Sequence, residues 1–157
     1  MPVRVQTEDF DVGHEIAALR AGNPQGGAGA SFIGVARDIN DGANVSTLTL
    51  EHYPGMTEAA LEDICQRARR RWDLLDVLVI HRVGPLQPLD QIVLVVVTSA
   101  HRGEAFAACE FVMDYLKTEA PFWKKEQTPS GSRWVDARES DDAARARWSE
   151  PGSREGA

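Results

Sequence analysis

Two apolar runs stand out in the middle of the chain. Residues 77–84, VLVIHRVG, and residues 91–98, QIVLVVVT, are rich in β-branched side chains, and the segment between them contains two prolines. Short apolar runs of this composition, bounded by turn-forming residues, are typical of buried strands. We predict two neighbouring strands here, of which the second is central in its sheet.

Weaker patterns of the same kind predict the remaining extended segments. They place strands at residues 3–6, 31–39 and 46–53, and short extended pieces at residues 121–126 and 132–135. Gly34 interrupts one of these strands and predicts either a β-bulge or the close approach of another backbone. Residues 21–30 are dense in Gly and Pro and predict a loop.

Helical spacing of apolar residues predicts four helices. They are expected at residues 11–20, 57–72, 102–119 and 140–148. In the second helix, Thr57 is the expected N-cap, and acidic residues come early while Arg67 to Arg71 come late, as the helix dipole favours. We therefore interpret that run of arginines as stabilising the end of the helix before giving it any functional meaning.

The helix over residues 102–119 carries the clearest apolar stripe. Phe106, Cys109, Met113 and Leu116 recur at helical spacing and are expected to face inward, and Pro121 ends the helix. The order of strands and helices indicates an α+β domain. At 157 residues the chain fits one domain, which we place at residues 1–150, followed by a frayed tail at residues 151–157.

Charge and cysteine content exclude several classes of protein. The formal net charge of −7 argues against a nucleic-acid binder, because such proteins need clustered Lys and Arg. Cys65 and Cys109 are far apart and have no metal-ligand spacing, so both are expected to be buried thiols, with no metal site. No apolar run is long enough to cross a bilayer, so we expect a cytoplasmic protein that does not bind membranes.

Lys117 is the first candidate for chemistry. At about 100° per residue, it falls within roughly 40° of Met113 and Phe106 on the helix surface, so a cation extends the apolar stripe. In the structural interpretation, a lysine in the last turn satisfies terminal carbonyls while its stem packs on apolar surface. In the functional interpretation, a partly buried ammonium has a lowered pKa and acts as an acid, a base or a nucleophile.

Three further candidates stand at the ends of predicted strands. His101 and Arg102 follow the central strand and precede a helix, a position where anions bind well, although the pair could equally just close the turn. Arg37 ends the strand that contains Gly34, where a solvated arginine is the ordinary finding. His81 and Arg82 lie within or at the end of a strand, and we interpret them as structural.

The segment after Pro121 offers the last cation. Strand alternation places Phe122, Lys124 and Glu126 on one side and Trp123 with Lys125 on the other, so only one lysine should enter a shared site. We choose Lys124, because Phe122 beside it offers an apolar wall to a flat heterocycle. Common hydrolase and nucleotide-binding motifs are absent, and adjacent Glu51 and His52 point to opposite faces, so we treat both as structural.

These segments together resemble a known family, the catalytic (large) subunit of molybdopterin synthase. The resemblance covers nearly all of residues 28–148. It is carried by FIGVARDINDG, LTLEHYPGM, VIHRVG, VTSAHRGEAF, FVMDYLKTEAPFWKKE and WVDARESD.

The resemblance implies an α/β-hammerhead fold, with a mostly antiparallel sheet packed against helices. It implies an enzyme of molybdenum cofactor biosynthesis that converts cyclic pyranopterin monophosphate to molybdopterin without a bound cofactor. It also implies a small ubiquitin-like partner whose thiocarboxylated carboxyl terminus supplies both sulfurs. The family's assembly is a homodimer of large subunits at the centre of a heterotetramer.

Site residues follow from the resemblance motif by motif. Lys117 and Lys124 match the catalytic lysines, and the remaining matches imply substrate binding by Arg37, His101, Arg102, Val35, Ala36, Lys125 and Glu126. Val35 stands where the family is expected to have a lysine-like residue, so its contribution would come from the backbone. An alternative from another class is a non-catalytic scaffold that binds a ubiquitin-like tail, and a generic nucleotide-binding domain is disfavoured by the missing phosphate loop.

Overall fold

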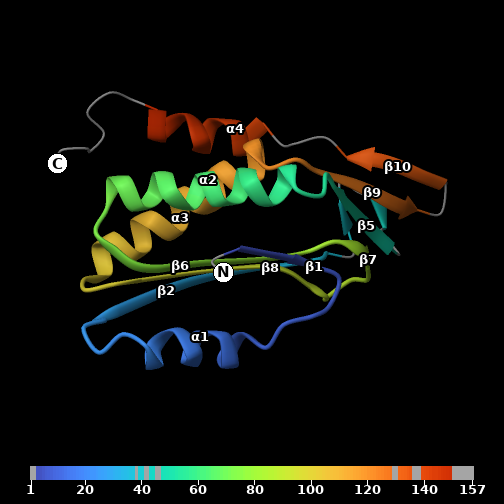
Figure 1. Cartoon of the computed structure of the whole chain (residues 1–157). Helices are drawn as coiled ribbons and strands as arrows, with labels where there is room; N and C mark the ends of the chain where they lie inside the picture. Colours follow the sequence, from blue (N-terminus) through green and yellow to red (C-terminus); the bar gives the residue numbers. More distant parts are fainter. Residues whose placement is uncertain are drawn as a thin grey trace.

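A four-stranded sheet forms the middle layer of the molecule (Figure 1). The computed structural model describes residues 3–37, 39, 40, 43, 44, 47–128, 131–135 and 139–149. The sheet has the order β1-β6-β8-β2. Its strands are β1 (Val3–Gln6), β6 (Leu74–Arg82), β8 (Gln91–Ser99) and β2 (Ala28–Val35). β1 pairs with β6 in parallel, and the other two pairings are antiparallel.

Helices cover both faces of this sheet. Helices α2 (Met56–Arg71) and α3 (Arg102–Glu119) lie on one face, and α1 (Val12–Ala21) lies on the other (Figure 1). Because side chains of a strand alternate between faces, the apolar runs of β6 and β8 fill two separate cores. Val79 and Val95 belong to the core under α2 and α3, whereas Ile80 and Leu94 belong to the core against α1.

A second sheet sits at one end of the first and has the order β10-β9-β5-β7. Its strands are β10 (Gly131–Val135), β9 (Phe122–Thr128), β5 (Thr47–His52) and β7 (Gly84–Leu86). All of its pairings are antiparallel. A short pair of strands, β3 (Ile39–Asn40) and β4 (Ala43–Asn44), completes the sheets of the described chain.

The last helical segments pack on the outer side of α3. They are α4 (Glu139–Ala146) and the 3₁₀ turn η1 (Arg147–Ser149). Trp148 of this turn contacts Trp72 and Phe111 edge to face, with ring centroids 5.7 and 5.5 Å apart. Its indole Nε1 donates to Asp114 Oδ2 at 2.7 Å, so the partly buried ring also satisfies its polar group. These contacts fix the carboxy-terminal helix against the body of the protein.

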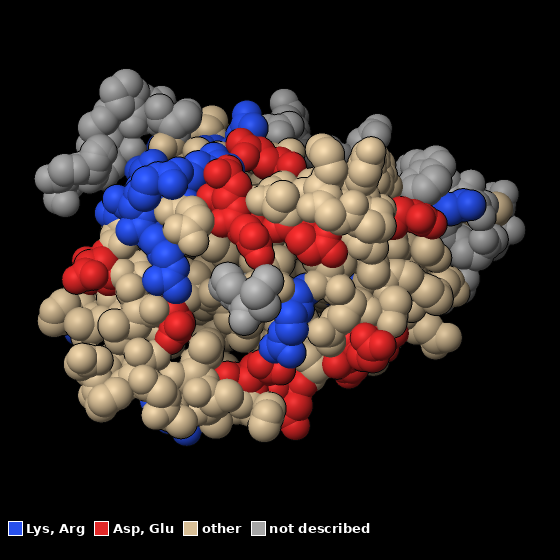
Figure 2. Space-filling view, in the orientation of Figure 1, with Lys and Arg blue, Asp and Glu red and all other residues tan. Residues whose placement is uncertain are grey.

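The charge run in α2 has the structural role predicted from the sequence. Glu58 lies in the first turn and Arg69, Arg70 and Arg71 lie in the last. Figure 2 shows basic side chains gathered over the end of this helix and acidic ones over its earlier part. The arrangement complements the helix dipole.

Much of the predicted order of elements is confirmed. The fold is α+β with mostly antiparallel strands, β8 is an interior strand, and α3 has the predicted bounds. The predicted irregularity at Gly34 is also confirmed, since the β2–β8 register shifts between Gly34 and Val35. A side chain at Gly34 would collide with Val93, because an added Cβ would lie 2.7 Å from its Cγ1.

Four local predictions are wrong. The loop over residues 21–30 is shorter, because α1 runs to Ala21 and β2 begins at Ala28, and strand β7 was not predicted. Gly55, with a φ of 86°, is the N-cap of α2, so Thr57 lies inside the helix. Phe106 is 65% exposed and does not face inward. The tail predicted at residues 151–157 lies outside the described residues.

Within the described chain, no helix has the length and apolar character needed to span a membrane.

Candidate active site

The candidate site lies where the two sheets meet. β9 follows α3 directly and pairs with β5, so Lys117 at the end of the helix and Lys124 in the strand come close together. In the central sheet, Val93 of β8 is the common partner of Gly34 in β2 and His81 in β6. The end of β2, which leads to Arg37, therefore lies at the same end of the sheet as His81.

His81 is the centre of this region. Its side chain is 5% exposed, and its ring stacks on Phe122 with centroids 3.8 Å apart and an interplanar angle of 16°. Nδ1 lies 2.8 Å from the backbone oxygen of Arg82. Alternation along β6 places His81 on the same face as Val77 and Val79, which is the face covered by α3.

The charged form of His81 is strongly disfavoured. The pKa of His81 is lowered to about 4, chiefly by burial and in addition by the nearby charges of Lys117, Lys124 and His52, while the hydrogen bond to the Arg82 carbonyl opposes the shift. The direction of these effects shows that two lysines from α3 and β9 share the environment of one histidine from β6. β6 is thus brought together with α3 and β9, which follow it by about twenty residues or more in the sequence.

Thr57 holds β9 in position beside this histidine. Its hydroxyl donates to the backbone oxygen of Pro121 at 3.0 Å and accepts from the backbone N–H of Tyr53 at 2.9 Å. The side chain is fully buried, so both bonds are shielded from water. Thr57 therefore ties the start of α2 to the turn that precedes Phe122 and Lys124.

The predicted alternation along β9 is confirmed where side chains are described. Phe122 and Lys124 are partly buried, whereas Trp123 and Lys125 are exposed on the other side. The side chain of Glu126 lies outside the described residues. Lys117 is exposed, so the expectation that its ammonium is partly buried is wrong for the single chain.

Val35 and Ala36 lie close to the second sheet. Ala36 is 3% exposed and packs with Leu48 and Leu50, whereas Val35 is 45% exposed. The backbone N–H of Ala36 donates to Asp90 O at 2.9 Å, and its oxygen accepts from the N–H of Leu89 at 2.8 Å. Ala36 thus anchors this end of β2 and leaves Arg37 exposed.

His101 and Arg102 are not brought to the lysines within one chain. They stand at the start of α3, and Lys117 comes fifteen residues after Arg102, which corresponds to about 22 Å along a helix. Ala28 pairs with Ser99 and Val35 pairs with Gln91. Arg37 and His101 therefore lie at opposite ends of β8, about 26 Å apart at the rise of a strand.

Neither cysteine has the properties of a nucleophile. Cys65 is 1% exposed and Cys109 is 6% exposed, which confirms the prediction that both are buried. Burial raises the pKa of the Cys65 thiol to about 12 and that of the Cys109 thiol to about 11, so both stay protonated near neutral pH. Among the described residues, no cluster of His, Cys, Asp or Glu side chains is suited to hold a metal ion.

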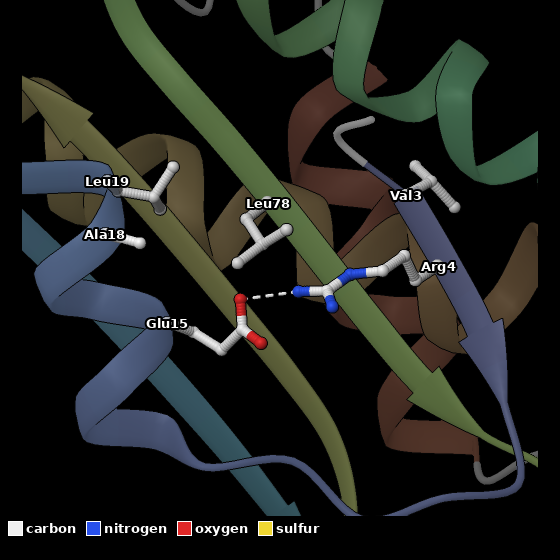
Figure 3. A pocket seen from close by; sticks show the side chains of 6 residues that line it. All are labelled: Val3, Arg4, Glu15, Ala18, Leu19 and Leu78. Carbon is white, nitrogen blue, oxygen red and sulfur yellow. Dashed lines mark hydrogen bonds and ion pairs between the residues drawn. The ribbon is translucent and has the colours of Figure 1, made fainter. Parts of the chain in front are cut away.

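A cavity of about 490 Å³ lies on the other face of the sheet, between α1 and strands β1 and β6 (Figure 3). Arg4 Nη2 donates to Glu15 Oε1 at 2.5 Å across it, and its other walls include Val3, Leu19 and Leu78. The two charges along its wall neutralise each other. None of the predicted site residues lines this cavity, so it is separate from the lysines.

Comparison with known proteins identifies the family. The model of the MoaE protein family matches residues 5–119. The chain belongs to this family, which confirms the resemblance seen in its motifs.

Relatives at high identity cover nearly the whole chain. The molybdopterin synthase catalytic subunit of Ralstonia nicotianae is 72% identical over 146 residues, which are 93% of this chain and 83% of the relative. The subunit of the same name from Escherichia coli is 57% identical over 144 residues, covering 92% of this chain and 95% of the relative.

Solved structures share the fold. A molybdopterin biosynthesis MoaE protein from Burkholderia ambifaria is 63% identical with a TM-score of 0.82, covering 94% of this chain and 97% of the other. Molybdopterin synthase from Staphylococcus aureus is 30% identical with a TM-score of 0.79, covering 87% of this chain and 98% of the other. Both similarities confirm the predicted fold class.

Sequence reasoning did not anticipate the central position of His81 in this cluster. Its neighbour Arg82 is structural, as predicted, because its guanidinium donates to backbone oxygens of Thr7 and Gln91. The two residues differ because alternation turns their side chains to opposite faces of the sheet. The only signal in the sequence was a histidine at a core-facing position of an apolar strand. That pattern does not distinguish a functional site from an ordinary hydrophobic core. His52, also interpreted as structural, joins the cluster because it pairs with Phe122 in the β5–β9 register.

Proposed function

We propose that this chain is the catalytic subunit of a molybdopterin synthase. It converts cyclic pyranopterin monophosphate to molybdopterin by accepting two sulfurs from the thiocarboxylated carboxyl terminus of a small ubiquitin-like subunit. The observation that carries this proposal is the convergence of Lys117 and Lys124 beside His81, in a chain whose relatives bear the name of this enzyme.

The two lysines supply the positive charge that sulfur transfer requires. The thiocarboxylate and the substrate phosphate are both anionic, and ammonium groups attract and orient them. As the thiocarboxylate sulfur attacks a carbon of the pterin side chain, a C–S bond forms and a C–O bond to the same carbon breaks, and Lys117 donates a proton to the oxygen that leaves. Water then cleaves the thioester that joins the partner's tail to the pterin, which leaves the sulfur on the pterin and releases the tail as a carboxylate. A second thiocarboxylated partner repeats the transfer, and Lys124 orients the substrate and the tail.

A partner is the natural source of the sulfur. The thiols of Cys65 and Cys109 are buried and protonated, so neither can carry a reactive persulfide to the lysines. Unpaired, buried cysteines are also typical of proteins from reducing compartments. We place the reaction in the cytoplasm on this ground.

The phosphate site requires a second copy of the chain. β2 is an edge strand, and it exposes Phe32, Ile33 and Val35 at 40%, 40% and 45%. An exposed apolar edge is a template for pairing with another strand. When β2 pairs antiparallel with β2 of a second copy, the Arg37 end of one strand meets the Ala28 end of the other.

This pairing assembles the remaining predicted residues. Ala28 lies beside Ser99, two residues before His101, so His101 and Arg102 of the second copy approach Arg37 and the lysines of the first. Arg37, His101 and Arg102 then bind the pterin phosphate, with Val35, Ala36, Lys125 and Glu126 near the substrate. A two-fold pairing produces two such sites, and a small subunit at each end completes the heterotetramer.

Reconstitution tests the enzymatic function. Purified chain is mixed with the cyclic pterin and with the small subunit carrying either a thiocarboxylate or a plain carboxylate. We expect molybdopterin, measured as its fluorescent oxidised derivative, only with the thiocarboxylate. A scaffold that merely binds the tail would form the protein complex in both mixtures but would show no phosphate-dependent affinity for the pterin. That result would exclude an enzymatic role.

A further inference from the structure

We propose that Thr57 is a positioning residue whose buried hydroxyl sets the placement of Lys124 relative to Lys117 by holding the turn between them. This inference rests on the proposed function, because the reaction assigned to the two lysines is the one whose rate depends on that placement. Thr57 is 0% exposed, so its hydroxyl acts through the backbone and not on the substrate.

A single tight turn joins the helix of one lysine to the strand of the other. Only two residues, Ala120 and Pro121, separate α3 from β9. The backbone N–H of Phe122 donates to the oxygen of Ala120 at 2.9 Å, which closes a three-residue turn around Pro121. The proline ring also fixes its own φ, so the turn is stiff. The position of Lys124 relative to Lys117 therefore depends on how Pro121 is held.

Thr57 holds the apex of this turn from a distant part of the chain. Its hydroxyl donates to the oxygen of Pro121, 64 residues away in sequence, at 3.0 Å and accepts from the N–H of Tyr53 at 2.9 Å. These directions are fixed, because a backbone oxygen only accepts and a backbone N–H only donates. β5 and β9 are paired as far as His52 and Phe122. Tyr53 and Pro121 come next in the same register, so the hydroxyl extends the pairing by one position.

The start of α2 gives this hydroxyl a rigid support. The backbone N–H of Thr57 donates to the oxygen of Tyr53 at 2.8 Å, which closes the connection from β5. Gly55 enters the helix with a φ of 86°, and its N–H donates to Glu58 Oε1 at 2.8 Å. The next turn of α2 buries Leu61 in the core, at 1% exposure. A hydroxyl on so fixed a backbone imposes the position of α2 on the turn that it binds.

The turn lies next to the stacked rings of the candidate site. Phe122, directly after Pro121, stacks on His81 with centroids 3.8 Å apart, so a shift of the turn would disturb this contact as well. Lysine side chains are long and flexible, and the fold places Lys117 and Lys124 through their backbones. A displacement of about 1 Å in a reacting group can cost about 100-fold in rate. The loss of the anchor should therefore lower turnover.

Three substitutions separate the hydroxyl from the packing around it. Thr57→Val keeps the shape of the side chain and removes the hydroxyl, whereas Thr57→Ser keeps the hydroxyl and removes the methyl group. Thr98→Val is the matched control. The Thr98 hydroxyl, on a residue that is 9% exposed, accepts from the N–H of Asp76 at 3.0 Å. Strand alternation places Thr98 with Leu94 and Val96 on the face covered by α1, away from the lysines.

Each variant is assayed for kcat and KM with the thiocarboxylated small subunit, and its thermal unfolding is followed. We expect kcat to fall about 10- to 100-fold in Thr57→Val, with KM for the cyclic pterin changed less than about threefold, because the proposed phosphate-binding residues lie on other elements. Thr57→Ser should stay within about threefold of the wild-type kcat, although it loses a buried methyl group.

The control should behave differently from Thr57→Val. Thr98→Val also loses a buried hydrogen bond, so its unfolding temperature should fall while its kcat stays at the wild-type value. Wild-type kcat in Thr57→Val would overturn the proposal. Values of kcat that simply follow the unfolding temperatures of the three variants would overturn it too, because Thr57 would then be only structural.

Amide hydrogen exchange tests the anchor without turnover. Tyr53 is 54% exposed and lies between β5 and α2, so slow exchange of its N–H depends on the bond to the Thr57 hydroxyl. We expect this amide to be protected at least about tenfold in the wild type and in Thr57→Ser, and to lose that protection in Thr57→Val. An unprotected Tyr53 amide in the wild type would refute the inference, even if Thr57→Val does not fold. Absence of product from wild-type protein would refute the proposed function instead.

Discussion

The residues of this site are either positively charged or neutral, yet they differ in what their side chains interact with. The positive charges of Lys117 and Lys124 lower the pKa of the buried His81 imidazole, whereas the guanidinium of the adjacent Arg82 donates to backbone carbonyls. A short sequence motif such as His-Arg therefore does not reveal which of its members belongs to a site. Burial and the direction of each side chain decide it.

Lys117 is the residue on which turnover should depend most. Lys117→Ala is expected to lower the rate of molybdopterin formation at least about 100-fold, because general acid–base groups typically contribute that much. Its exposed position means that the unfolding temperature should hardly change. Arg70→Ala, which removes another exposed cation at the end of α2, is the matched control and should retain turnover. Full turnover in Lys117→Ala would contradict the assigned role.

His81 should make the folded state sensitive to acid. Its pKa falls from 6.5 to about 4 on folding, so the unfolded chain binds the extra proton first. The contribution to stability is complete above pH 6.5 and is lost as the pH falls towards 4, by about 3 kcal/mol in total.

Urea unfolding at pH 7 and pH 4.5 measures this loss. Comparing wild type with His81→Phe at both values removes the effect of the carboxylates, which titrate in both proteins. We expect the stability of the wild type relative to the variant to be lower at pH 4.5 than at pH 7. An equal difference at the two values would show that His81 is not held neutral by the fold.

At the scale of elements, local periodicity identified α3 and most of its buried side, because Cys109, Met113 and Leu116 are buried as predicted. Phe106 lies on an exposed flank, whereas Ala105 and Ala108 are 1% and 0% exposed and face the sheet. Small side chains let the helix approach the strands closely, so the alanines rather than the larger phenylalanine occupy the interface. Of the four residues predicted to face inward, only Phe106 does not, because the size of an apolar side chain does not show whether it faces the sheet.

Strand β2 is the element on which the proposed dimer depends. Ile33→Lys adds a charge to its exposed edge, and edge lysines disfavour strand pairing. We expect the dimer to dissociate at concentrations where the wild type stays paired, as measured by analytical ultracentrifugation. Turnover should fall with it, because each phosphate site needs both copies.

The matched control for this change is Met56→Lys. Met56 is also exposed and apolar, but it starts α2 and is not part of the sheet edge. The Met56→Lys substitution should leave the association state unchanged. A dimer that persists unaltered in Ile33→Lys would place the interface elsewhere on the molecule.

At the scale of the whole molecule, the separation of Arg37 from His101 within one chain gives a test of shared sites. Arg37→Ala and His101→Ala should each be nearly inactive alone. When the two variants are co-expressed, a mixed dimer has one site with both changes and one site with neither. Random pairing should therefore restore about a quarter of wild-type turnover.

The result is measured on the co-purified mixture at fixed total protein, with each variant alone as the reference. Activity no higher than that of the separate variants would mean that Arg37 and His101 do not act in opposite copies of one dimer.

The sequence by itself determined most of the secondary structure, the interior strand, the burial of both cysteines and the family. These features depend on local periodicity, on composition and on contiguous motifs, all of which are visible along the chain. They also sufficed to select Lys117 and Lys124, because the motifs that contain them are local.

Only the tertiary structure decided which of these residues meet. The register of β6, β8 and β2 places His81 and the Arg37 end together, and the β5–β9 pairing brings Phe122 and Lys124 onto the same histidine. The same register separates Arg37 from His101 by the length of β8. Strand order and register arise from contacts between distant segments, so spacing along the chain does not specify them.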